Sequence, residues 1–451
     1  TIINWQQFSI RPDEITRFIQ SGAMSAVLNR VTGHEHSQLL GQLLSNGRVF
    51  LVNPNGITIG QGALIDTAGF VASSLNISDA DFLSGRMRFQ ALAGEPGKVV
   101  NQGTLSAHSG GQIYLIAPNV ENHGVITAPN GDVLLAAGKS VEVVSSASPH
   151  IRVELNAPDN GEALNVGQVV GGRIGIYGGL VAHSGTASAD RVEVGDGGNI
   201  ILRASKVLQT GVLSANAAQG RGGNVEVRGD TNVIQTQGAR ISVQGAEGGG
   251  TATVATNADG GYTFTSATID ATSVSGSGGA IHVLGESIAL AGASIDASGA
   301  TRGGTVLVGG DRQGANPDVP NARSVFGNFS TAIKADATTQ GDGGKVVVWS
   351  DHTTRFGGAL SARAGANRGD GGFIEVSGKQ TTVFAGTANA SSPYGRAGTF
   401  LLDPKNIFID EVTSGVSFRD LLDPNPNSDG QGGNGFGNYV VATVGGNTLV
   451  T

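Results

Sequence analysis

Cysteine is absent from all 451 residues of the sequence. This absence excludes disulfide cross-links, zinc sites built on cysteine and cysteine nucleophiles. It also suits a chain that stays unfolded while it passes through an oxidising compartment, where free thiols would cross-link too early.

Charge and long apolar runs are also scarce. Charged residues make up 14% of the sequence, the formal net charge is −8, and the 28 Lys and Arg residues are scattered. This balance argues against nucleic acid as the main partner, because such a protein would carry a basic stripe. No run of 18 apolar residues occurs, so we expect no membrane-spanning helix.

Glycine is abundant, with 73 residues, about twice the average share. Many glycines form pairs that are followed by an alternating strand pattern and preceded by a shorter one, as in "ASIDASG". The first member of each pair recurs after 25, 27, 29, 25, 40, 28 and 26 residues, at Gly197, Gly222, Gly249, Gly278, Gly303, Gly343, Gly371 and Ala397. Nearer the N-terminus, Asn101-x-Gly103 recurs as Asn122-x-Gly124.

This repetition predicts the fold class. The apolar residues alternate with period 2, and no segment has a persuasive period of 3.6. Short strands in units of nearly constant length predict an all-β, right-handed parallel β-helix with a capped N-terminus and extra-helical loops. We interpret residues 311–330, within the 40-residue interval, as an insertion and as the best candidate for a specific partner site. For residues 11–20, a short helix and an extra strand both remain open.

The stretch "VFLVNPNGITIG", residues 49–60, joins two strand patterns by Asn-Pro-Asn-Gly. Each of the four residues favours a turn for its own reason. Pro54 suits the second position of a type I turn, whereas Asn55-Gly56 suits a primed hairpin turn. Local chemistry therefore predicts a turn and leaves its type open.

Five stretches of the first 145 residues resemble the secretion domain of two-partner-secretion exoproteins, the filamentous-haemagglutinin-like adhesins of Gram-negative bacteria. These stretches are "TIINWQQFSI", "AVLNRVTG", "SQLLGQLLSNGRVFLVNPNGITIG", "ASSLNISDADFLSG" and "GQIYLIAP". The family's Asn-Pro-Asn-Gly secretion motif corresponds to Asn53, Pro54, Asn55 and Gly56. A second family motif, Asn-Pro-Asn-Leu, is replaced here by "QSGAMS", residues 20–25. In this respect the chain looks more like the high-molecular-weight adhesins and the haem:haemopexin-binding exoproteins.

The resemblance implies three regions within a longer protein. Residues 1–145 would be the secretion domain, with the N-terminal cap and first coils. Residues 146–400 would be a glycine-rich β-helical shaft, and residues 401–451 would begin a further β-rich segment.

The resemblance also implies a partner and a location. The partner would be a dedicated outer-membrane transporter whose periplasmic domains recognise the unfolded or partly folded secretion domain. The product would be a secreted, surface-associated adhesin and virulence factor, a monomeric rod with an unidentified receptor on a host or bacterial cell. Two alternatives remain open: an exoprotein that binds a haem carrier, and the stalk of a contact-dependent toxin.

Other candidate sites are weaker. Arg-Gly-Asp occurs twice, and either copy would suit a cell-adhesion turn, although turn chemistry alone explains both glycines. The residues concerned are Arg228, Gly229, Asp230, Arg368, Gly369 and Asp370. Asp270 and Asp296 occupy matching positions in successive repeats. A β-helix enzyme that cleaves polysaccharides would need such acids together with a basic residue on a neighbouring coil. We expect no basic residue in the column, that is, at the equivalent positions of stacked coils, and therefore no enzyme. The histidine spacing does not match a metal site, and we expect no cofactor.

Overall fold

The computed structural model describes residues 1–92, 94–144, 151–157, 161–257 and 259–403. From residue 404 onward, the β-rich segment expected at 401–451 lies outside the described residues. The chain divides into two compact units. The first contains residues 1–191, 197–215 and 224–229, and the second contains residues 192–196, 216–223 and those from 230 onward.

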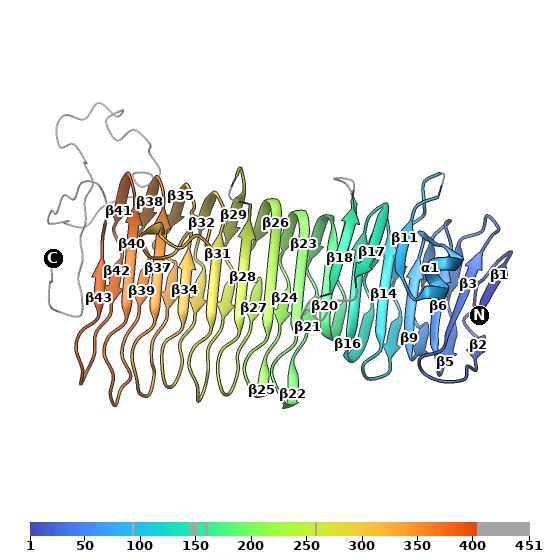
Figure 1. Cartoon of the computed structure of the whole chain (residues 1–451), viewed down its shortest axis with the longest axis horizontal. Coiled ribbons are helices and arrows are strands. Elements are labelled where there is room, and N and C mark those ends of the chain that lie inside the picture. The colour runs from blue at the N-terminus through green and yellow to red at the C-terminus, as the bar shows by residue number, and fades with distance from the viewer. Residues whose placement is uncertain (93, 145–150, 158–160, 258, 404–451) are drawn as a thin grey trace. The chain divides into compact units, whose positions relative to one another are not determined.

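In the first unit, the strands of successive coils stack on one another in parallel (Figure 1). Their pairings define three stacks of strands, here called faces 1, 2 and 3 in chain order. Face 1 contains β1 (Ile2–Trp5), β3 (Ala26–Val31), β6 (Arg48–Val52), β9 (Gly69–Ser73) and β14 (Gln112–Ala117). Face 2 contains β4 (Ser37–Leu39), β7 (Ile57–Ile59), β12 (Val99–Asn101), β15 (Val120–Asn122) and β19 (Glu162–Asn165). Face 3 contains β2 (Ile15–Phe18), β5 (Gln42–Ser45), β8 (Leu64–Thr67) and β13 (Thr104–Ala107).

Longer strands continue the first unit by bending around a corner between faces. These strands are β16 (Val125–Ala137), β20 (Gln168–His183) and β23 (Asn199–Gln209). Two short strands continue face 3, β21 (Thr186–Ser188) and β24 (Val212–Ser214). Residues 11–20, for which a helix and a strand were both open, contain strand β2.

The second unit repeats the coil of three strands. Face 1 contains β28 (Thr251–Thr256), β31 (Ala280–Leu284), β34 (Thr305–Val308), β37 (Lys345–Ser350), β40 (Phe373–Gly378) and β43 (Thr399–Leu401). Face 2 contains β29 (Tyr262–Thr265), β32 (Ser287–Leu290), β35 (Ser324–Gly327), β38 (Thr353–Phe356) and β41 (Thr381–Phe384). Face 3 contains β27 (Arg240–Ser242), β30 (Thr268–Asp270), β33 (Ser294–Asp296), β36 (Ala332–Lys334), β39 (Ala359–Ser361) and β42 (Thr387–Asn389).

Strand β26 (Asn224–Gln235) runs from the first unit into the second, and β22 (Arg191–Val194) and β25 (Ala217–Gln219) form a separate two-stranded sheet. The predicted fold class, an all-β right-handed parallel β-helix, is confirmed. The repeat pattern indicated two strands per coil, on faces 3 and 1, and missed the short strands of face 2.

The glycine pairs of the second unit lie at the corner between faces 3 and 1. A Cβ atom on Gly304 would lie 2.1 Å from the carbonyl oxygen of Gly279 in the preceding coil. A Cβ atom on Gly303 would lie 1.9 Å from the carbonyl oxygen of Ala335 in the following coil. Each pair is therefore required because the backbones of neighbouring coils approach too closely for a side chain.

A ladder of buried amide side chains runs through the first unit at the end of face 2. Asn101 Nδ2 donates to Asn122 Oδ1 (2.8 Å), and Asn122 Nδ2 donates to Asn165 Oδ1 (2.7 Å). Asn165 Nδ2 lies 3.1 Å from His183 Nδ1, and His183 Nε2 lies 3.1 Å from Val212 O. The neutral tautomer with its proton on Nε2 satisfies both contacts of His183. The Asn-x-Gly repeat thus supplies polar groups that bond one another inside the β-helix.

Two segments leave the first unit at the corner between faces 1 and 2. They supply β10 (Asn76–Ile77), α1 (Asp79–Ser84), β11 (Met87–Gln90), β17 (Ser140–Val144) and β18 (Arg152–Asn156). The four strands form an antiparallel sheet outside the β-helix (Figure 1). Phe89 and Val141 of this sheet pack against Leu28, Phe50 and Tyr114 of face 1, so face 1 is apolar on its outer side as well.

The sequence reasoning did not predict α1. Ser78 caps its N-terminus by accepting a hydrogen bond from Asp81 N, and Gly85 ends it with a positive φ of 75°. None of its six residues is buried. A helix this short shows no apolar period, so its capping residues were the only available signal.

The predicted insertion at 311–330 ends earlier than expected. Ser324–Gly327 forms β35 in register with β32 and β38, and Ala322 N donates to Gly309 O (2.7 Å). The loop packs on face 1 of its own unit, where the Asp311 carboxylate pairs with Lys345 Nζ (2.7 Å). The Arg312 guanidinium also lies 4.9 Å from the centre of the Phe373 ring. The alternation in "SVFG" is too short to identify a strand after a proline-containing loop.

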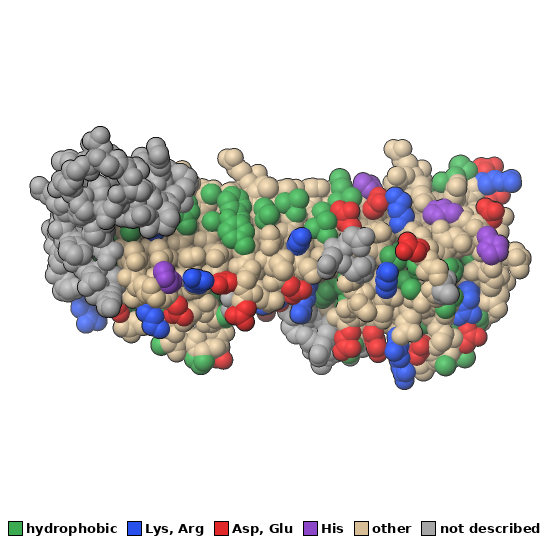
Figure 2. All heavy atoms as spheres, turned by 90° about the horizontal axis from the view of Figure 1, so that it is seen from above, with side chains coloured by type: hydrophobic (Ala, Val, Ile, Leu, Met, Phe, Trp, Pro, Cys, Tyr) green, Lys and Arg blue, Asp and Glu red, His purple; other side chains and the backbone are tan. Residues whose placement is uncertain are grey.

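The surface drawn in Figure 2 shows acidic and basic side chains interspersed, with polar groups and backbone between them. In the described part of the chain, no helix has the length and apolar character needed to cross a bilayer.

We predict that Gly304→Ala lowers the free energy of unfolding by about 1–3 kcal/mol, the usual range for overpacking. The measurement is chemical denaturation followed by circular dichroism. The matched control is Gly22→Ala, because a Cβ atom there would meet nothing within 4 Å. Equal stability of the two variants would contradict the role of the glycine pairs.

His183 should make stability depend on pH. Burial lowers the pKa of its imidazole from the usual 6.5 to about 4. As pH falls from about 7 to 4, the unfolded chain takes up a proton that the folded chain refuses, which removes about 3 kcal/mol of stability. His183→Asn should flatten unfolding midpoints measured across this range, whereas His34→Asn, at an exposed position, should not. A pH profile that is unchanged in His183→Asn would contradict the assignment.

Candidate functional site: the turn at residues 53–56

The turn at Asn53–Gly56 lies at the corner between faces 1 and 2, where β6 ends and β7 begins. Asn53 O accepts a hydrogen bond from Gly56 N (2.9 Å). Gly56 has a positive φ of 102°, whereas Pro54 and Asn55 do not have positive φ angles. These angles exclude the primed hairpin turn and agree with a type I turn.

The Asn53 side chain is fully buried and makes four hydrogen bonds. Its Nδ2 donates to Glu35 O and to Ser37 Oγ, both at 2.9 Å. Its Oδ1 accepts from Asn55 N (2.9 Å) and from Asn55 Nδ2 (3.0 Å). The two donors and two acceptor positions of this amide are therefore all used, and no other side chain of this size offers the same set.

The turn also bonds the coil before it. Asn55 Nδ2 donates to Gly33 O (2.9 Å). His36 Nδ1 lies 3.1 Å from Asn55 O, and His36 Nε2 lies 2.8 Å from Thr58 Oγ1. The ring therefore donates from Nδ1 to the carbonyl oxygen and bonds the threonine hydroxyl through Nε2.

The turn also bonds the coil after it. The chain leaves the β-helix after Ser73, forms β10, α1 and β11 outside it, and returns at Gly97. There Gly97 N donates to Pro54 O (2.8 Å), and Ile57 N donates to Lys98 O (3.1 Å). The turn therefore joins three successive coils and holds the point where the chain re-enters the β-helix.

A second Pro-Asn pair occupies the same corner two coils later. The chain leaves the β-helix after Ala137 and returns at Glu162, whose N donates to Asn119 Oδ1 (3.0 Å). The carbonyl oxygen of Asn119 also accepts from Val99 N (3.1 Å). Sequence reasoning missed Asn119, although the "APN" that contains it, residues 117–119, is a visible signal.

The two Arg-Gly-Asp sequences have different conformations. Arg228, Gly229 and Asp230 lie inside strand β26 and are not a turn, which corrects the expectation for the first copy. Arg228 Nε pairs with Glu226 (2.6 Å) along the same strand. The stretch "NVEVRGDTNVIQ" forms one continuous strand, so inward and outward residues continue to alternate through this copy.

The second copy, Arg368 to Asp370, lies outside the regular strands, and Gly369 has a φ of 121°. The Asp370 carboxylate accepts hydrogen bonds from Arg396 N (2.9 Å) and Arg396 Nη2 (2.7 Å) of the next coil. These bonds, led by the one from the backbone, lower the pKa of Asp370. Its carboxylate is thus used in coil-to-coil contact, and an adhesion role for this copy stays a prediction.

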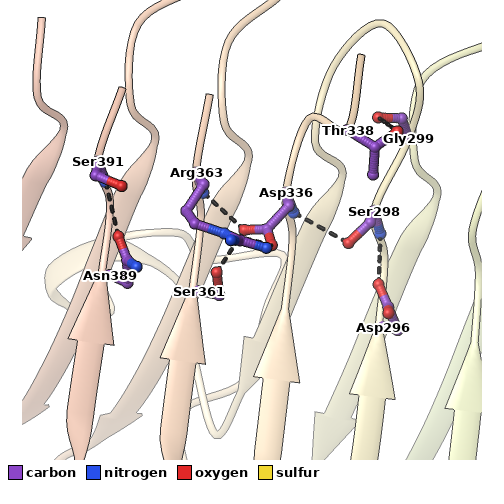
Figure 3. A network of polar contacts seen from close by, with 9 residues as sticks. All are labelled: Asp296, Ser298, Gly299, Asp336, Thr338, Ser361, Arg363, Asn389 and Ser391. Carbon is purple, nitrogen blue, oxygen red and sulfur yellow. Dashed lines mark hydrogen bonds and ion pairs between the residues drawn. The ribbon is translucent and has the colours of Figure 1, made fainter. Parts of the chain in front are cut away.

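The repeated acids of face 3 also hold turns together (Figure 3). Asp296 stacks between Asp270 and Lys334, so a basic residue does share this column, contrary to expectation. Buried Asp336 accepts from Ser361 Oγ (2.6 Å) and from Arg363 N (2.7 Å). Burial raises the pKa of Asp296, whose Oδ1 accepts from Ser298 N (2.9 Å). The described residues contain no group of three His, Cys, Asp or Glu side chains that would hold a metal ion.

The chain is similar to several known proteins. The model of the TPS secretion domain, where TPS stands for two-partner secretion, matches residues 1–227, past the last of the sequence motifs. Two heme/hemopexin-binding proteins of Haemophilus influenzae, one from strain Rd, are 35% identical over 166 residues and 40% identical over 75 residues. These matches cover 35% and 17% of this chain but only 18% and 8% of the relatives, so the chain spans less than a fifth of their length.

The crystal structure of the HMW1 secretion domain from Haemophilus influenzae is also similar. Its TM-score is 0.58 at 30% identity, with 89% of this chain and 92% of that chain covered. The chain belongs to the TPS secretion domain family.

Proposed function

We propose that this chain directs a two-partner-secretion exoprotein to its outer-membrane transporter and then nucleates folding of the β-helix after export. The observation that carries the proposal is the set of hydrogen bonds by which residues 53–56 join three successive coils. Folded coils offer an open strand edge on which the next coil can pair, so growth needs a first stable edge.

The position of the turn explains why nucleation would depend on it. Successive face 1 strands β9 and β14 are separated by the long segment that forms β10, α1 and β11. Closing such a segment costs conformational entropy before any contact is gained. The returning chain bonds this turn twice, because Gly97 N donates to Pro54 O and Lys98 O accepts from Ile57 N. These two bonds would set the register of the coils that follow.

The proposed partner is the periplasmic part of a transporter of the two-partner-secretion type. Asn53 is buried in the folded chain, so the transporter would read this side chain before folding, whereas Pro54 and Asn55 stay half-buried. The proposed product is secreted and surface-associated, and its shaft presents binding surfaces as an adhesin does.

The proposed role involves no catalysis. The stacked acids support this proposal, because their oxygens are engaged in hydrogen bonds within and between coils. Asp270 Oδ1 accepts from Thr272 N (3.0 Å) and Asp270 Oδ2 accepts from Gln244 Nε2 (2.6 Å).

Binding of a haem carrier is the second candidate function of the exoprotein. It is favoured by the two relatives named as heme/hemopexin-binding proteins. Their likeness to this chain covers a small part of their length, so it supports a shared export route more strongly than a shared ligand.

The export role predicts that Asn53→Ala combined with Asn55→Ala reduces secretion several-fold, because the side-chain hydrogen bonds from this turn to the preceding coil are lost. The chain would be expressed with a signal peptide and its transporter, and the fraction in the medium measured. The matched control is Asn389→Ala in the second unit, where Oδ1 accepts a local bond from Ser391 N (3.0 Å). Undiminished export of the double variant would refute the proposal.

The refolding rate of the same purified double variant separates the two parts of the role. Slow refolding together with poor export supports nucleation. Poor export with a normal refolding rate leaves recognition by the transporter as the function of these residues.

A further inference from the structure

A polar groove of about 600 Å³ crosses four coils of the second unit, beside the corner between faces 3 and 1. Each coil contributes the same four consecutive positions to its lining: the residue before the glycine pair, the two residues of the pair, and the first residue of the face 1 strand. The four sets are residues 302–305, 342–345, 370–373 and 396–399. The groove therefore has two walls of side chains and, between them, a floor of backbone in which only Ala397 carries a side chain.

The backbone amides of the floor are already hydrogen-bonded. Gly303 N donates to Asp342 O (3.0 Å) and Gly304 N donates to Ala297 O (2.8 Å), and the same two bonds recur at the next two glycine pairs. Gly304 O accepts from Lys345 N (2.9 Å). An extended peptide that adds to a sheet needs free amides and carbonyls along an edge. A ligand in this groove would therefore be recognised by the side chains of the walls.

The charges of the walls are balanced. The charged residues of the lining are Arg302, Asp342, Lys345, Asp370 and Arg396. Lys345 Nζ pairs with Asp311 and Arg396 Nη2 pairs with Asp370, both at 2.7 Å. One cation, Arg302, and one anion, Asp342, are left without an ion pair in the described part of the chain. This balance favours a neutral ligand over a polyanion or a polycation.

Several polar groups of the walls are accessible and available. Arg302, Asp342 and Thr399 are all exposed. Within the residues that the structure describes, the side chains of Arg302, Thr305 and Thr399 make no hydrogen bond. Asp342 Oδ1 accepts from Asp370 N (2.9 Å), and Asp342 Oδ2 is left for a ligand. Guanidinium groups donate, carboxylates accept and hydroxyl groups do both, so this set suits a ligand rich in hydroxyl groups.

The repeat of the groove matches that of an extended sugar chain. Stacked coils are about 4.8 Å apart, so the four coils span about 14 Å. The rings of a β-1,4-linked chain of hexopyranoses follow one another at about the same spacing as the coils. Phe373 adds apolar surface beside the polar groups, a mixture that is typical of ligand sites.

We propose that this groove binds a neutral, linear β-1,4-linked oligosaccharide that lies across the four coils. The walls hold its hydroxyl groups, and the glycine pairs let its rings approach the backbone. The inference names a ligand class for the binding surfaces of the proposed shaft, and it does not depend on the export role.

Isothermal titration calorimetry of the purified full chain tests the proposal without any secretion step. We expect cellotetraose or chitotetraose to bind saturably and at least fivefold more tightly than maltotetraose, whose α-linkages curve the chain. Tetragalacturonate tests an acidic sugar chain as the ligand, and the blocked peptide acetyl-Ala-Ser-Ala-Ser-amide tests an extended peptide. Both should bind at least fivefold more weakly than the better of the two β-linked tetrasaccharides.

A variant of the walls tests the location. Arg302→Ala combined with Thr399→Ala should weaken binding of the better tetrasaccharide at least tenfold and leave the unfolding midpoint unchanged, because neither side chain bonds the rest of the described protein. Arg323→Ala is the matched control, since this exposed arginine lies at the corner between faces 1 and 2 of the same unit, and it should bind as the parent chain does.

Three results would overturn the proposal. The first is the absence of saturable binding of both β-linked tetrasaccharides. The second is binding of maltotetraose, tetragalacturonate or the peptide that is as tight as theirs. The third is unchanged binding by the double variant.

Discussion

Close stacking of one backbone coil on the next is the constraint on which the rest of this structure depends. Where neighbouring coils touch at a corner, only hydrogen fits on the α-carbon, and the glycine pairs of the second unit follow from this fact. Where the coil interior cannot avoid polar groups, they have to bond their equivalents above and below, as Asn101, Asn122 and Asn165 do. The residues that repeat in the sequence are therefore those that make contacts between coils, more than those that set the conformation of a single coil.

The same constraint leaves the corner between faces 1 and 2 as the place where the longer segments leave the coils. The extra-helical segments of the first unit and the loop after Gly309 all leave there. After each long segment of the first unit, a Pro-Asn pair in an earlier coil bonds the returning chain: Pro54 bonds Gly97, and Asn119 bonds Glu162. The turn at residues 53–56 therefore has a physical role in the folded domain, because it bonds the chain where it returns after an interruption.

Some of this was predictable from the sequence. The glycine period predicted the fold class because stacking acts on every coil alike, and the chemistry of residues 53–56 predicted a turn. The partners of Asn53 are Glu35 O and Ser37 Oγ. They were beyond prediction because a backbone acceptor has no sequence signal and because both residues lie a coil away. Strand β35 and helix α1 were missed because each is too short to show a period.

On the proposed role, the coils joined by residues 53–56 form first during folding and later coils add to them. Pulsed hydrogen exchange during refolding of the full chain tests it most directly. We expect the amides of Gly56, Ile57 and Gly97, which are all hydrogen-bonded at this turn, to become protected before the amide of Gly344, which bonds Ala335 O in the second unit. Protection of the Gly344 amide before those of Gly56, Ile57 and Gly97 would contradict this order of folding.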